Sequence, residues 1–60
     1  MNAALLALVL QNFLAVHGEY SDLESWELPH PMYLLGWIDF PPDEDDMEQA
    51  HAFVMAHCAA

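Results

Sequence analysis

Apolar residues recur at helical spacing near both ends of this 60-residue chain. In the first of these segments, residues 3 to 16, one broad face of a helical wheel collects Leu5, Leu6, Val9, Leu10, Phe13 and Val16. The opposite stripe holds Ala4, Ala7, Gln11 and Ala15. The pattern predicts an N-terminal helix over 3–16 that ends at a Gly18 cap. Because its solvent face is narrow and uncharged, the rest of the chain or a second copy must cover it.

A second helix is predicted from about residue 43 to residue 58. Its apolar stripe consists of Met47, Ala50, Val54 and Cys58, flanked by Phe53 and Met55. The side chains expected to face solvent or a partner are Asp45, Glu48, Gln49, Ala52 and Ala56. Asp43 stands where an N-cap residue would be needed.

The middle of the chain allows two interpretations. The sequence "SDLE" at 21–24 matches a capping box and favours a short helix to Leu28, stopped by Pro29, with Pro31 opening another. The alternative is a hairpin in which 23–28 pairs with 32–38, since the residues near Trp37 also suit a strand. We favour the helices. The predicted fold is therefore all-α, a small compact bundle forming one domain over 1–60; the alternative is α+β with a central two-stranded hairpin.

Chain length limits the core that can form. A domain of this size buries only about 60% of its unfolded surface, and small folds usually need a disulfide, a metal or a partner. Cys58 is the only cysteine, so an intramolecular disulfide is excluded. We therefore consider a homodimer as the supplement, formed through Leu6, Val9, Leu10 and Phe13.

The apolar N-terminus raises the question of targeting. It has no positive n-region, and a helix over 3–16 would span roughly 21 Å, against about 30 Å of hydrocarbon core. We expect a soluble cytoplasmic protein.

The charge composition is the most unusual feature of the sequence. The chain has ten carboxylates, no lysine and no arginine, and a net charge of −10. Such a chain lacks the cations that phosphate contacts require, which argues against nucleic-acid binding and against anionic membranes. Its electrostatic partner should be basic.

The carboxylates form two groups along the chain. Acids at the start of the second predicted helix interact favourably with its dipole, which explains their location. It does not explain their number, nor the absence of every base. We therefore predict a partner-binding surface formed by Asp43, Glu44, Asp45, Asp46 and Glu48 together with Glu19, Asp22, Glu24 and Glu27.

The sequence offers little for catalysis or metal binding. No glycine-rich phosphate loop is present, and no cation is available to stabilise an oxyanion. Glu48 and His51 have the spacing of one di-iron ligand pair, but a site needs more ligands. We predict a non-enzyme without cofactor or metal. The aromatic residues Tyr20, Trp26, Tyr33, Trp37 and Phe40 are interpreted first as core; the alternative is that one or two are exposed among the acids as interface anchors.

In size, acidity and lack of basic residues the chain resembles the small phage-encoded anti-CRISPR proteins. The resemblance is compositional and rests on no motif. It implies a non-enzymatic phage protein that acts in the cytoplasm of a bacterial host cell, as an inhibitor whose carboxylates replace phosphates in the basic nucleic-acid-binding site of a Cas effector or a similar protein. The alternative is a structural or interaction subunit that oligomerises through its apolar N-terminal helix, with the acids serving solubility.

Overall fold

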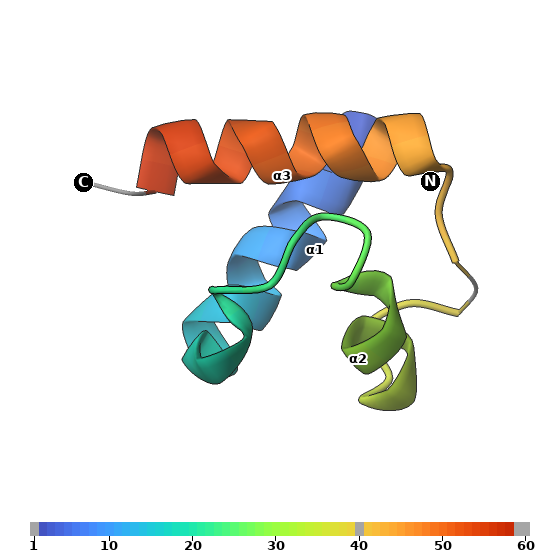
Figure 1. The fold of residues 1–60 in the computed structure, drawn as a ribbon. Helices are drawn as coiled ribbons and strands as arrows, with labels where there is room; N and C mark the ends of the chain where they lie inside the picture. The colour runs from blue at the N-terminus through green and yellow to red at the C-terminus, as the bar shows by residue number, and fades with distance from the viewer. Residues whose placement is uncertain (1, 40, 59–60) are drawn as a thin grey trace.

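The computed structural model is all-α over the residues it describes, 2–39 and 41–58. The elements are α1 (Ala3–Val16), the 3₁₀ helix η1 (Gly18–Tyr20), α2 (Pro29–Leu34) and α3 (Glu44–Cys58). The long helices α1 and α3 cross each other, and η1, α2 and the segment that links them lie below α3 in Figure 1. The described residues form no strand, so the alternative hairpin is absent. The expectations for Phe40 and for the Cys58 side chain fall outside the described residues.

The bounds of α1 follow from its first and last hydrogen bonds. The Asn2 side-chain oxygen accepts a hydrogen bond from the Leu5 N–H at 2.8 Å and caps the start. At the other end, the His17 N–H donates to the Phe13 carbonyl at 2.7 Å. The helix confirms the prediction for 3–16. The cap predicted at Gly18 was wrong, because His17 is the capping residue and Gly18 begins η1.

The core lies where α1 packs against α3 and the middle segment. Its buried residues are Leu6, Ala7, Leu10, Phe13, Leu28, Met32, Ile38, Met47, Ala50 and Val54. Ala7 was predicted on the solvent stripe but is buried. Leu5 and Val16 were predicted on the buried face but are exposed. The buried face is therefore rotated from the predicted one.

The residues proposed for a dimer interface are mostly unavailable. Leu6, Leu10 and Phe13 each have 0% of their surface exposed within a single chain, and Val9 packs against the same core. A second copy could contact them only if the fold opened. The sequence pattern identified apolar residues that need cover, and the chain itself covers them.

The predicted helix from Ser21 to Leu28 does not form. The Ser21 N–H donates to the Gly18 carbonyl at 3.1 Å, so Ser21 ends η1 instead of capping a new helix. Residues 21–28 make turns, and Leu28 is buried. Pro29 occupies the first position of α2, where its missing N–H costs nothing, so it begins this helix, whereas Pro31 was predicted to open it and Pro29 to stop a preceding one.

A Schellman motif ends α2. The Trp37 N–H donates to the Met32 carbonyl at 2.8 Å, and the Gly36 N–H donates to the Tyr33 carbonyl at 3.1 Å. Gly36 has φ of 84°, the left-handed conformation that this motif requires. The motif turns the chain so that Trp37 and Ile38 return to the core.

Phe13 is the centre of an aromatic cluster that joins the middle of the chain to α1. Its ring stacks on Tyr20 at 5.5 Å between centroids and meets Trp37 edge-on at 5.8 Å. Tyr20 and Trp37 are half-buried and pack against the core, so their predicted core role is confirmed in part. Trp26 and Tyr33 are exposed, which corrects the core prediction for both.

Among the described residues, no helix combines the length and hydrophobicity needed to cross a bilayer.

Candidate functional site

The acids of α3 project from a rigid helix start. The Asp43 carbonyl accepts the first helical hydrogen bond, from the Met47 N–H at 2.9 Å, which puts Asp43 at the predicted N-cap position. The first turn carries Glu44, Asp45 and Asp46. Acids there are each favoured by about 0.3–1 kcal/mol through the helix dipole. The carboxylates are thus held on a helix that the buried Met47 side chain anchors to the core.

A second segment brings an aromatic side chain to the same region. The turn at 24–27 is closed by the Glu27 N–H, which donates to the Glu24 carbonyl at 2.9 Å. Leu28, next in the chain, is fully buried, whereas Trp26 is 74% exposed. The buried leucine anchors the turn to the core. The indole is consequently presented to solvent from a short, anchored segment.

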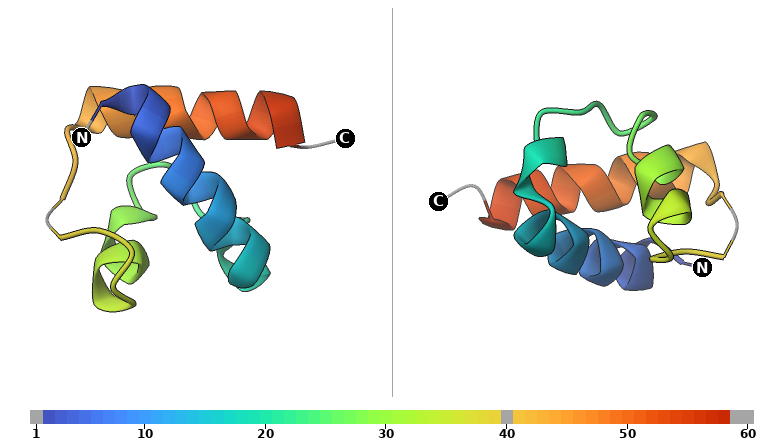
Figure 2. Two further views of the ribbon diagram at one scale, coloured as in Figure 1. Left: turned by 180° about the vertical axis from the view of Figure 1, so that it is seen from behind. Right: turned by 90° about the horizontal axis from the view of Figure 1, so that it is seen from below.

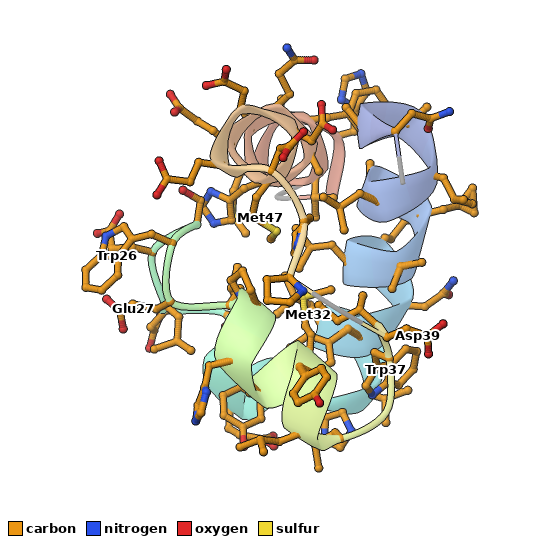
Figure 3. All side chains as sticks on the ribbon, turned by 90° about the vertical axis from the view of Figure 1, so that its right-hand side faces the viewer. Trp26, Glu27, Met32, Trp37, Asp39 and Met47 are labelled. Carbon is orange, nitrogen blue, oxygen red and sulfur yellow. The ribbon has the colours of Figure 1, made fainter. Side chains whose placement is uncertain are left out.

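The two segments line a common groove of about 500 Å³, which we call the tryptophan groove. Its lining residues are Ser25, Trp26, Pro29, Pro41, Pro42, Glu44, Met47 and Glu48. Figure 3 shows Trp26 and Glu27 projecting side by side from the turn, on the side of the molecule opposite Asp39. The groove therefore combines an exposed indole, two proline rings from the linker before α3, and two helix-borne carboxylates.

The structure brings together part of the predicted acidic surface. Glu44 and Glu48 line the tryptophan groove, and Glu24 and Glu27 flank its Ser25 and Trp26 in the chain. Asp45 and Glu48 also line a shallower hollow of about 320 Å³ with Gln49 and Ala52. Asp43 is exposed and Asp46 half-buried at the same helix start.

Glu19 and Asp22 lie elsewhere. Glu19 belongs to η1, at the end of α1 that points away from α3 in the left view of Figure 2. Its carboxylate lies 3.5 Å from His17 Nδ1, a contact that becomes an ion pair when the imidazole is protonated. Asp22 lies two residues after the end of η1 in the chain. The nine predicted residues thus divide between a larger group around the start of α3 and a smaller group beside η1.

Trp26 was predicted first to be a core residue, and this prediction was wrong. Its immediate neighbours, Ser25 and Glu27, are polar, and this was the available signal for exposure. The capping-box match at 21–24 favoured a short helix through this position, and that helix does not form. An exposed indole among carboxylates was weighed only as the alternative.

Metal chemistry finds little support in the described part of the chain. It contains no group of three or more histidine, cysteine, aspartate or glutamate side chains placed to hold a metal ion. His51, which pairs with Glu48 in sequence spacing, is half-buried, and its Nε2 is buried without a hydrogen-bond partner among the described residues. That nitrogen is better understood as a cost to stability than as a ligand.

In comparisons with protein-family models, curated proteins and solved structures, nothing matches this chain.

Proposed function

We propose that this protein is a non-enzymatic inhibitor that occupies the basic nucleic-acid-binding site of a partner protein, as the anti-CRISPR nucleic-acid mimics do with Cas effectors. The observation that carries the proposal is the tryptophan groove: an indole that is 74% exposed beside Glu44 and Glu48, in a chain with ten carboxylates and no lysine or arginine.

The groove suits a cationic side chain. An arginine guanidinium can donate two hydrogen bonds to one carboxylate and can stack on an aromatic face, and the cation–π contact contributes about 0.5–2 kcal/mol. Pro29, Pro41 and Pro42 are rigid and lose little conformational entropy on binding. We therefore expect an arginine of the partner to enter the groove beside Trp26.

The helix-borne acids would supply the phosphate-like part of the surface. Residues three apart on a helix are separated by about 4.5 Å along its axis, so Asp45 and Glu48 have a fixed spacing. A basic site that normally holds a nucleic-acid backbone accepts a rigid anionic surface of suitable shape. Rigidity on α3 distinguishes this surface from a disordered acidic tail.

A defined peptide tests the groove before any partner is known. In a Trp37→Phe background, Trp26 is the only indole, and an arginine-rich peptide should change its fluorescence saturably at low salt. Glu44→Gln with Glu48→Gln should weaken binding at least tenfold, which is about 1.4 kcal/mol. Asp39→Asn, an acid on the other side of the molecule, is the control. An equal loss with Asp39→Asn would show non-specific charge attraction.

The function itself is tested by capture from bacterial lysate with the protein as bait. We expect bound proteins that are displaced by competing duplex DNA and by salt, and whose DNA binding the protein inhibits. Trp26→Ala and the Glu44→Gln, Glu48→Gln variant should lose both capture and inhibition. A partner that stays bound under excess DNA would contradict the proposal.

A further inference from the structure

A second groove lies between the two long helices and is distinct from the tryptophan groove. It has a volume of about 370 Å³ and is lined by Ala3, Ala4, Ala7, Leu8, Gln11, Gln49 and Phe53. We call it the alanine groove. None of these residues lines the tryptophan groove. Two of the lining residues are large, apolar and partly exposed: Leu8 is 57% exposed and Phe53 is 52% exposed.

The lining of the alanine groove is free of charged side chains. All ten carboxylates of the chain lie outside α1 and outside residues 49–57 of α3. The alanine groove is built from those two segments alone. At the tryptophan groove, two copies of a chain with net charge −10 would bring carboxylates toward carboxylates. The lining of the alanine groove contains no carboxylate, and the nearest acids, Asp45 and Glu48, lie beside its Gln49 edge.

Phe53 is held in a fixed position although it is half exposed. Its ring stacks on His57 at 4.1 Å between centroids with an interplanar angle of 20°. The His57 ring is in turn fixed by a 2.9 Å hydrogen bond between its Nδ1 and the Phe53 carbonyl. A preorganised aromatic side chain beside a hollow walled by alanines is the arrangement of an interface anchor and its receiving pocket.

We propose that the alanine groove is the interface of a homodimer. Because protrusion and hollow lie on one face, a two-fold axis would set Leu8 and Phe53 of each copy against the alanines of the other. The two tryptophan grooves would stay free in such a dimer, since the two sites share no residue. The proposal does not depend on the proposed function and is tested on the protein alone.

The small size of the chain and the like charge of the two copies limit the expected affinity of the homodimer. A standard interface buries about 800 Å² per partner, a large share of a chain whose whole exposed surface is 4088 Å². We expect a smaller and weaker contact. The total charge of the two copies opposes association at long range, and salt screens it, so added salt should strengthen the dimer. Binding of a basic partner has the opposite salt dependence.

The experiment is sedimentation equilibrium of the full chain from about 10 μM to about 1 mM, a range suited to a weak interface, at low and moderate salt. The apparent mass should rise from the 6.8 kDa of the monomer toward twice that value, and rise further with salt. Leu8→Glu and Phe53→Glu should each shift the midpoint at least tenfold toward monomer while far-UV circular dichroism is retained.

Leu34→Glu is the matched control, because Leu34 is also exposed but lies on α2 and lines neither groove. It should leave the midpoint unchanged. A mass of one chain throughout the concentration range at both salt levels would overturn the proposal. So would a dimer that both glutamate variants leave intact, or one that Leu34→Glu alone disrupts.

Discussion

Trp26 and Glu48 line the same groove although one belongs to the turn before α2 and the other to α3. Their proximity depends on Leu28 and Met47, the buried neighbours that fix each segment to the core. The candidate site is thus a product of the tertiary fold. Neither the turn at 24–27 nor the start of α3 forms this groove alone.

This division of roles predicts different effects for two nearby substitutions. Trp26→Ala should change the free energy of unfolding by less than about 0.5 kcal/mol, since the indole is mostly in water. Leu28→Ala should lower it by about 2–5 kcal/mol, because it leaves a cavity. Urea denaturation monitored by circular dichroism measures both. A large loss with Trp26→Ala would mean that the indole packs against the protein.

Adjacent leucines of α1 provide a second matched pair. Leu6 is fully buried and Leu5 is 54% exposed, although the helical wheel placed both on the apolar face. Leu6→Ala should cost about 2–5 kcal/mol of unfolding free energy, and Leu5→Ala well under 1 kcal/mol. Similar costs for the two, measured by urea denaturation, would indicate that the broader predicted face is buried after all.

The comparison of Leu5 with Leu6 also indicates what the sequence could predict. Periodicity placed α1 and α3 closely and gave the all-α class, because each helix has its own repeating apolar stripe. It could not fix the rotation of α1, since apolar residues surround most of that helix and only the crossing with α3 selects the buried ones. Ala7 is buried there, while Val16 is left exposed.

The prediction for the middle segment, residues 21–28, was wrong for a different reason. Ser21 matches a helix cap, but η1 uses its N–H first, and burial of Leu28 then holds the following chain in turns. A local motif was overridden by a tertiary contact. The acidic residues of the candidate site could be identified from composition, yet their grouping around Trp26 and away from Glu19 required the folded arrangement.

The two glycines should respond differently to alanine. Neither has an atom within 4 Å of an added Cβ, but Gly36 has φ of +84° whereas Gly18 does not have positive φ. Gly36→Ala should therefore cost about 1 kcal/mol through backbone strain. Gly18→Ala should be neutral or stabilising by up to about 1 kcal/mol, because alanine restricts the unfolded chain. Thermal unfolding at one protein concentration distinguishes them.

His51 predicts a stabilising substitution. Its buried Nε2 has no hydrogen-bond partner among the described residues, and such a group costs about 1–3 kcal/mol. His51→Leu should raise the free energy of unfolding by about 1 kcal/mol. His30→Leu, at an exposed position on α2, is the control and should have little effect. No gain from His51→Leu would indicate that water reaches this nitrogen in solution.

Salt should stabilise the isolated protein. No lysine or arginine is present to balance ten carboxylates, so they repel one another, and the exposed pair Glu44 and Glu48 meets at i,i+4 on α3. Raising ionic strength from about 10 mM to about 150 mM shortens the screening length from about 30 Å to about 8 Å. Relief of about 1 kcal/mol of this repulsion would raise the Tm of a domain this small by about 4–8 °C.

Calorimetry at constant protein concentration measures the shift in Tm, and a concentration series separates this shift from the effect of dimer formation. The Glu44→Gln, Glu48→Gln variant should show a smaller shift than wild type, and a Tm that does not respond to salt would show that the carboxylates are too far apart to form a concentrated acidic surface.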